Sequence, residues 1–150
     1  MSDITTVILA AGNSTRFKAS KSKLVYPLCG LPIVSHIFNI AKKISGKNIL
    51  VVSNEKNKEE LKLILNTSKL VVQKKQKGTA DAIEQVKKYV KSKNILILFG
   101  DTPLVEVKDI RKLVSKFKKS KAKASLIAFN TLEPHGYGRL LSVSYTHLRA

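Results

Sequence analysis

The sequence predicts an α/β protein, a three-layer α/β/α sandwich built around a Rossmann-like, mostly parallel sheet. Five short runs are almost entirely apolar, as strands must be when both faces of a parallel sheet are covered. Four stretches between them carry apolar residues at spacings of three and four, with lysines on the opposite side. This alternation of strand and helix favours right-handed crossovers that place helices on both faces of the sheet.

Each expected strand except the last is followed by a helix. We expect the first strand at residues 4–10 and the first helix at residues 34–44, after a long loop. Further strands are expected at residues 49–52, 70–72, 95–99 and 124–129, separated by helices at residues 58–65, 79–90 and 107–118. Ligands of such sheets bind beyond the carboxyl ends of the strands, so the segments directly after the strands are where chemistry is expected.

Length and composition limit the classes of protein to which the chain can belong. Its 150 residues, 43% of them hydrophobic, suffice for one core and are too few for two full domains. The single cysteine, Cys29, excludes an intrachain disulfide. The first residues are not basic, and the apolar run at residues 7–11 is too short for a signal peptide or a membrane span. We therefore expect a soluble cytoplasmic protein without a membrane partner.

The formal net charge of +18 raises nucleic acid as a partner, because clustered cations release counterions from a phosphate backbone. Nearly all of this charge is lysine on the outer faces of expected helices. Only four arginines occur, whereas proteins that read nucleic acids favour arginine and interleave aromatic residues for stacking. A solvated lysine surface explains the charge better, so a noncatalytic nucleic-acid-binding module ranks below an enzyme.

The loop after the first strand suits the phosphates of a nucleotide. The strand breaks into small residues and then presents Arg16 and Lys23. Backbone N–H groups in such a loop, together with two cations, can hold a polyphosphate. The loop lacks both the Gly-Lys-Ser/Thr ending of a Walker A motif and the GxGxxG pattern of dinucleotide-binding folds, so P-loop and dehydrogenase functions are excluded.

Two side-chain amides follow the third strand. Gln73 and Gln76 precede Gly78, and Thr79 can cap the helix that starts there. Because carboxamides donate and accept hydrogen bonds at once, they suit the edge of a nucleobase. A polar loop before a capped helix is the plainer alternative.

The segments after the fourth and fifth strands complete the candidate set. Asp101, with Gly100 before it, is well placed to hold a divalent cation against phosphate oxygens. Its alternative role is a cap for the next helix, but Thr102 and Glu106 sit nearer to that helix. The turn at residues 136–139 either brings backbone amides to a ligand or rounds a corner.

Taken together and in this order, these segments resemble the sugar-phosphate pyrophosphorylases, nucleotidyltransferases with the nucleotide-diphospho-sugar transferase type of fold. The shared motifs are Leu-Ala-Ala-Gly with Thr-Arg, the lysine at position 23, Gln-x-x-Gln-x-Gly-Thr, Gly-Asp-x-Pro-Leu and Gly-Tyr-Gly-Arg. The chain closely resembles the N-terminal uridylyltransferase domain of bifunctional bacterial enzymes that make UDP-N-acetylglucosamine. The resemblance extends from residue 6 to residue 141.

This resemblance implies a reaction of UTP with N-acetylglucosamine 1-phosphate that gives UDP-N-acetylglucosamine and pyrophosphate and feeds cell-wall precursor synthesis. It assigns Arg16 and Lys23 to catalysis at the triphosphate, and Asp101 to a Mg²⁺ cofactor. It also implies a set of residues that bind the nucleotide and line the nucleotide-sugar site, namely Leu9, Ala10, Ala11, Gly12, Gln73, Gln76, Gly78, Thr79, Phe99, Gly100 and Gly138.

The chain also departs from the family pattern. Asp81 stands where a histidine is common, and we expect it on the helix exterior. Residues 142–150 do not resemble the family, so residues 1–141 are expected to be a partial nucleotidyltransferase domain joined to a foreign or frame-shifted tail.

Family members continue with further metal and sugar ligands and with a trimeric acetyltransferase domain. We therefore expect a homotrimeric full-length protein and an inactive fragment. A sister nucleotidyltransferase acting on another sugar phosphate, methylerythritol phosphate or a molybdenum cofactor stays open as an alternative.

Overall fold

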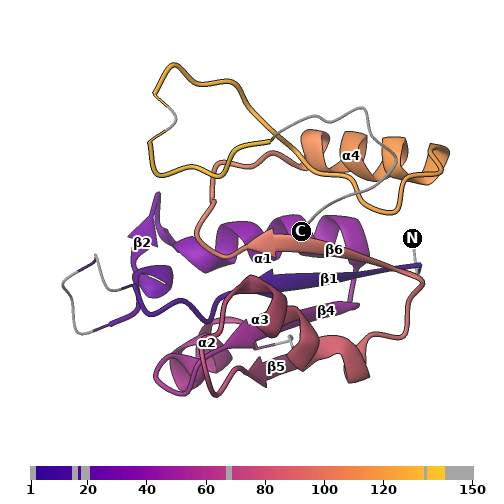
Figure 1. Ribbon diagram of the computed structural model, residues 1–150. Coiled ribbons are helices and arrows are strands. Elements are labelled where there is room, and N and C mark those ends of the chain that lie inside the picture. Colours follow the sequence, from indigo (N-terminus) through magenta and orange to yellow (C-terminus); the bar gives the residue numbers. More distant parts are fainter. Residues whose placement is uncertain (1–2, 15–16, 18–20, 67–68, 134, 141–150) are drawn as a thin grey trace.

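A four-stranded parallel sheet forms the centre of the protein in the computed structural model (Figure 1). The structure describes residues 3–14, 17, 21–66, 69–133 and 135–140. The strands of this sheet lie in the order β5-β4-β1-β6, so the first strand of the chain is central. Their bounds are β1 Ile4–Leu9, β4 Ile49–Ser53, β5 Lys69–Val72 and β6 Asn94–Phe99. All three pairings are parallel, as the apolar runs predict.

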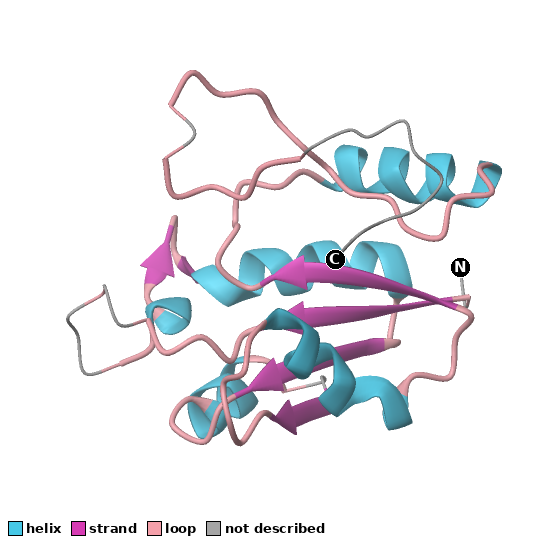
Figure 2. Ribbon diagram, in the orientation of Figure 1, coloured by secondary structure: helices cyan, strands magenta, loops and turns pink. Residues whose placement is uncertain are grey.

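Helices cover both faces of the sheet, which confirms the predicted three-layer sandwich (Figure 2). The helices are α1 Ile33–Ser45, α2 Lys58–Ile64, α3 Thr79–Val86 and α4 Val107–Lys119, with 3-10 helices η1 Lys23–Val25 and η2 Lys87–Tyr89. One face of the sheet packs against α1, α2 and α4, and the other packs against α3 and η2.

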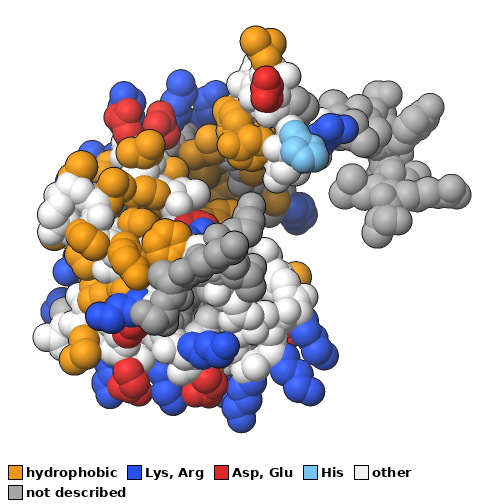
Figure 3. Space-filling view, turned by 90° about the vertical axis from the view of Figure 1, so that its left-hand side faces the viewer, with side chains coloured by type: hydrophobic (Ala, Val, Ile, Leu, Met, Phe, Trp, Pro, Cys, Tyr) orange, Lys and Arg blue, Asp and Glu red, His pale blue; other side chains and the backbone are white. Residues whose placement is uncertain are grey.

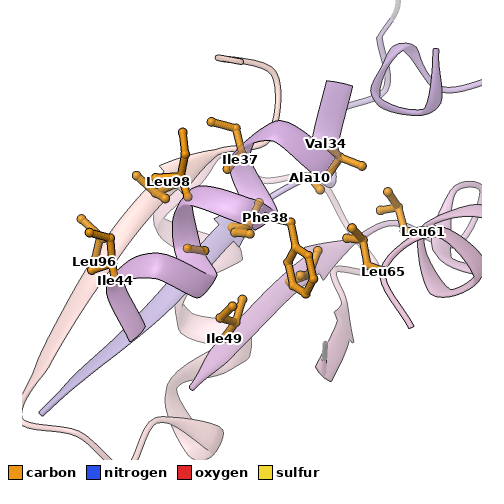
Figure 4. Packing of buried hydrophobic residues seen from close by; sticks show 14 of the residues in the cluster. Ala10, Val34, Ile37, Phe38, Ile44, Ile49, Leu61, Leu65, Leu96 and Leu98 are labelled. Atoms are coloured by element: carbon orange, nitrogen blue, oxygen red, sulfur yellow. The ribbon is translucent and has the colours of Figure 1, made fainter. Parts of the chain in front are cut away.

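Side chains of β1 alternate between the two faces, as the pleat of a strand requires. Ile4 and Ile8 are buried in the cluster that α1 covers, whereas Val7 is buried in the cluster on the α3 face. Figure 4 shows the larger cluster, to which Ile37 and Phe38 of α1 contribute together with residues of the sheet. The centre of the sheet is therefore fixed by apolar packing on both sides.

The predicted fifth strand is wrong. Residues 124–129 form an irregular segment after α4, and Leu126 and Phe129 expose 60% and 66% of their surface. An apolar run becomes a strand only where a neighbouring strand supplies hydrogen-bond partners. No described strand pairs with this segment, and β6, at the edge of the sheet, pairs within the described chain only with β1.

A small hairpin that the sequence analysis missed precedes α1. It pairs β2 Pro27–Leu28 with β3 Leu31–Pro32 through a turn at Cys29 and Gly30, both of which have positive φ angles. The ring nitrogen Nε2 of His36 donates to the carbonyl oxygen of Leu28 at 2.8 Å. This contact fixes the hairpin to α1.

Two further expectations concern the chain as a whole. The predicted tail at residues 142–150 lies outside the described residues. Among the helices that the structure describes, none has the length and apolar character needed to cross a bilayer.

Candidate functional site

A cavity of about 760 Å³ lies at the carboxyl ends of β1, β5 and β6. This is where a parallel sheet is expected to bind its ligand. Figure 3 views the molecule from the side toward which the strands point in Figure 1, with lysines and arginines around the lower rim of this face. The cavity is lined by segments that lie far apart in the sequence. The lining residues are Leu9, Ala10, Ala11, Gly12, Ser14, Phe17, Lys23, Leu24, Gln73, Gln76, Gly78, Thr79, Ala82, Phe99 and Asp101.

The last residue of β1, Leu9, and the loop that follows it, residues 10–12, form one wall of this cavity. The loop packs closely against its neighbours. It continues the sheet's hydrogen bonding for a short distance, because the Ala10 N–H donates to the Val52 carbonyl at 2.8 Å and the Gly100 N–H donates to the Leu9 carbonyl at 2.9 Å. A Cβ atom at position 100 would lie 3.2 Å from the Leu9 carbonyl oxygen. Gly100 thus packs against the loop after β1 and is not itself among the cavity-lining residues.

Lys23 and Asp101 form an ion pair at the cavity. The Lys23 Nζ donates to Asp101 Oδ2 at 2.6 Å, and the two side chains are 35% and 41% exposed. Lys23 begins η1, whose preceding Ser22 hydroxyl accepts the Leu24 N–H. A cation and a carboxylate side by side in an open cavity are available to phosphate oxygens and to a metal ion, respectively.

The donor set around Asp101 fits Mg²⁺ only as a site with one protein carboxylate. Within the described ranges, no cluster of three or more His, Cys, Asp or Glu side chains is arranged to hold a metal. Protein-bound Mg²⁺ often relies on one or two carboxylates, with substrate phosphates and water as its other ligands. Asp101 meets that requirement at the same cavity as Lys23.

The Gln73 side chain lies deep in the cavity wall, only 3% exposed. Its amide nitrogen donates to Asp81 Oδ2 at 2.6 Å and to the Gly78 carbonyl at 3.2 Å. The expected exterior position of Asp81 is therefore wrong, because this carboxylate turns toward Gln73. The contact between Gln73 and Asp81 could not be predicted from the sequence. The two residues are eight positions apart with a loop between them, and no periodic pattern relates them.

Gln76 and Asn13 link two loops beside the cavity. The Asn13 amide nitrogen donates to Gln76 Oε1 at 3.1 Å, although the residues are 63 positions apart. Gly78, with a φ angle of 104°, is the N-cap of α3, and Thr79 is its first residue. Thr79 therefore does not cap the helix as expected, but both residues line the cavity.

Arg16 and Gly138 are the remaining predicted site residues. Arg16 lies outside the described residues. Gly138 is exposed and is not among the residues that line the cavity. The sequence analysis also overlooked Ser14, a cavity residue with a φ angle of 50° whose buried hydroxyl has no hydrogen-bond partner among the described residues.

The family of the chain follows from a match between residues 6–149 and the model of the MobA-like NTP transferase domain. The chain belongs to this family. It is 41% identical over 140 residues to the bifunctional protein GlmU of Buchnera aphidicola subsp. Schizaphis graminum, covering 92% of the chain and 30% of that protein. It is 38% identical to GlmU of Campylobacter fetus over 94% of the chain and 32% of that protein. The chain thus spans about a third of the length of these NTP transferase relatives.

Several solved structures share the fold of this NTP transferase domain. The bifunctional IspDF from Campylobacter jejuni matches with a TM-score of 0.67 and 21% identity, over 79% of the chain and 31% of IspDF. A CMP:2-keto-3-deoxy-manno-octonic acid synthetase complexed with CTP matches with a TM-score of 0.64 and 19% identity, over 81% of the chain and 49% of that protein. The nucleotide-diphospho-sugar transferase type of fold is therefore confirmed.

Proposed function

We propose that the protein from which this chain derives transfers a uridylyl group from UTP to N-acetylglucosamine 1-phosphate in the cytoplasm. The single observation that carries the proposal is the cavity that brings together the loop after β1, the Lys23–Asp101 pair and the Gln73 and Gln76 loop. These are the segments that share motifs with the uridylyltransferase domain, and the relatives that match the chain are bifunctional GlmU proteins.

In the proposed reaction, a phosphate oxygen of N-acetylglucosamine 1-phosphate forms a bond to the α-phosphorus of UTP. The bond between that phosphorus and the bridging oxygen to the β-phosphate breaks, and pyrophosphate leaves with the electron pair. A phosphate monoester is already a competent nucleophile, so the protein contributes alignment and charge neutralisation.

The residues of the cavity divide this work. The Lys23 ammonium group neutralises phosphate oxygens as negative charge moves to the leaving group. The Asp101 carboxylate would hold Mg²⁺, which supplies further charge neutralisation at the phosphates when it is bound. The polar wall formed by Gln73, Gln76 and Gly78 provides amide and backbone groups for the uracil edge.

Nucleotide binding by the purified chain tests the proposal. UTP, CTP, ATP and GTP are titrated calorimetrically into the 150-residue protein with Mg²⁺ present, and we expect UTP to bind best. Pyrophosphate release is then measured with N-acetylglucosamine 1-phosphate and other sugar 1-phosphates, using the longer protein. Failure of UTP to bind, or preference for another nucleotide, would refute the uridylyl assignment.

The fragment itself is expected to turn over little or no substrate. It spans about a third of the matched GlmU relatives, and Asp101 is the sole carboxylate among the described residues that line the cavity. Measurable UDP-sugar formation by the purified chain would contradict this expectation.

Transfer to another acceptor, such as a different sugar phosphate, is the second candidate function, because the family model covers NTP transferases in general.

A further inference from the structure

Two buried asparagines sit directly behind the loop that follows β1. Asn54 and Asn57 lie between β4 and α2 and are only 3% and 2% exposed. The Asn57 amide nitrogen donates to the Ala10 carbonyl at 2.8 Å. The Asn54 amide nitrogen donates to the Ala11 carbonyl at 2.9 Å. Each bond spans more than 40 residues of sequence.

The two side chains also fix each other. The Asn54 N–H donates to Asn57 Oδ1 at 3.0 Å, and the Asn57 N–H donates to Asn54 Oδ1 at 2.9 Å. Each side chain thus uses its oxygen on the neighbouring backbone and its nitrogen on the loop after β1. A carboxamide can do both at once, whereas a carboxylate cannot donate. We call this arrangement of Asn54 and Asn57 the asparagine clamp.

The clamp determines where the next two N–H groups point. In a trans peptide unit, the C=O of one residue and the N–H of the following residue point in opposite directions. Holding the Ala10 and Ala11 carbonyls toward Asn54 and Asn57 therefore turns the N–H groups of Ala11 and Gly12 away from these asparagines. Both residues line the cavity, and neither N–H donates to another residue within the described ranges.

We propose that Asn54 and Asn57 are positioning residues that aim the Ala11 and Gly12 N–H groups at acceptor oxygens of the bound nucleotide. The inference rests on the proposed nucleotide-binding function and adds to it two residues that do not line the cavity. Two successive N–H groups without an acceptor among the described residues suit an anionic or carbonyl oxygen. Their fixed direction removes a reorganisation cost on binding, because the asparagines hold the loop before the ligand arrives.

Isosteric substitutions with a matched control test the clamp. Asn54→Asp and Asn57→Asp keep the size of the side chain and replace its donor with an acceptor. The control is Asn48→Asp. The Asn48 amide nitrogen donates to the carbonyl of Ile4, the first residue of β1, at 3.0 Å. All three variants lose a side-chain hydrogen bond to a backbone carbonyl, Asn48→Asp at the start of β1 and the other two at the cavity, in the loop that follows β1.

UTP affinity and amide chemical shifts are measured for the 150-residue chain at a temperature where each variant is folded. We expect each clamp variant to bind UTP about tenfold more weakly, as for the loss of roughly one preorganised hydrogen bond. In the free protein, Asn57→Asp should shift the Ala11 N–H resonance and Asn54→Asp the Gly12 N–H resonance. Asn48→Asp should leave both UTP affinity and these two resonances unchanged.

The outcomes separate this inference from the proposed function. If the wild-type chain does not bind UTP, the proposed function fails and the inference falls with it. If the wild type binds UTP and the clamp variants bind equally well, only the inference is overturned. If an aspartate variant does not fold, the corresponding serine variant, Asn54→Ser or Asn57→Ser, is measured instead, because its hydroxyl group keeps a shorter donor. If these also fail to fold, the clamp is a folding requirement and the inference is overturned.

Discussion

Lys23 and Asp101 are the charged residues whose placement bears most directly on chemistry. Their contact of 2.6 Å joins positions 78 apart, and both side chains remain partly exposed. Exposed ion pairs contribute about 0–1 kcal/mol to folding, because water screens the charges. The Lys23–Asp101 pair therefore contributes little to the stability of the fold. This favours a role of the two residues in ligand binding.

Lys23→Met should therefore separate binding from stability. We expect UTP affinity in the presence of Mg²⁺ to fall about tenfold or more, because the variant loses a charge-assisted hydrogen bond to phosphate, which contributes roughly 1.5–3 kcal/mol. The free energy of unfolding should change by less than about 1 kcal/mol. Calorimetric titration and urea denaturation measure the two quantities.

Lys108→Met is the matched control for Lys23→Met. Lys108 lies 2.8 Å from Glu106, and this hydrogen bond to the carboxylate raises the pKa of Lys108. Lys108 lies on α4 and does not line the cavity. Its removal should leave UTP affinity unchanged, and an equal loss of affinity in both variants would contradict the assignment of Lys23.

At the level of elements, the start of α3 depends on a contact that crosses the preceding loop. Asp81 in the first turn of α3 accepts from the buried Gln73 amide and also from Gln85, at 2.6 and 3.4 Å. A carboxylate in the first turn also interacts favourably with the positive end of the helix dipole. One residue thus fixes both the helix start and the orientation of Gln73.

Asp81→Ala should destabilise the protein by about 1–3 kcal/mol, because the buried Gln73 amide loses its shorter acceptor. For a chain of this size, that corresponds to a decrease in Tm of roughly 2–4 °C per kcal/mol. Thermal unfolding followed by circular dichroism measures the change. Glu84→Ala provides the control in the same helix, since Glu84 is exposed and, among the described residues, pairs with exposed Lys87. Equal Tm values for the two variants would argue against the Gln73 contact.

The elements also show what can be predicted from sequence and what cannot. The strands at residues 49–53 and 94–99 were recognisable because burial on both faces demands a continuous apolar run. The same pattern misled at residues 124–129, since apolar composition does not reveal whether a pairing edge exists. The hairpin at residues 27–32 was missed because each of its strands has two residues, too few for any periodicity.

The candidate site divides in the same way. The glycine and lysine motifs after β1 and the Gln73 loop follow the strands along the chain, so the topology of a parallel sheet predicts that they meet. The asparagine clamp and the Asn13–Gln76 contact were not predictable, because they depend on side-chain directions between segments 43 to 63 residues apart.

Over the whole molecule, lysine charge is far from balanced. The chain carries 28 lysines and arginines against 10 acidic residues, and few of the positive charges form ion pairs in the described residues. Unpaired like charges destabilise a compact state through mutual repulsion. Salt shortens the range of this repulsion, to about 10 Å at 0.1 M.

Increasing NaCl from 20 to 300 mM, roughly the range over which screening becomes effective, should therefore raise the Tm. Differential scanning fluorimetry at low protein concentration measures the change. A nonionic osmolyte of equal osmolality controls for effects that do not involve charge. A Tm that falls with NaCl would show that favourable ion pairs outweigh the repulsion.

The same charge opposes association of an exposed apolar surface. Leu126, Ile127 and Phe129 are more than half exposed after α4, and Ile95 and Phe99 of the edge strand β6 are 42% and 49% exposed. Figure 3 shows hydrophobic side chains gathered over the upper half of the face at the carboxyl ends of the strands. Exposed apolar surface beside a strand edge without a described partner favours contact with a second molecule.

We expect the chain to be monomeric at low salt and to self-associate as salt screens its charge. Light scattering and sedimentation at 20 and 500 mM NaCl, about a fivefold change in screening length, measure the oligomeric state. The double substitution Ile127→Lys and Phe129→Lys should suppress association at high salt, because it adds charge within the apolar segment. Leu63→Lys serves as the control, since Leu63 is 83% exposed on α2. If Leu63→Lys reduces association as strongly as the double substitution does, net charge alone governs contact between molecules, and the segment after α4 does not.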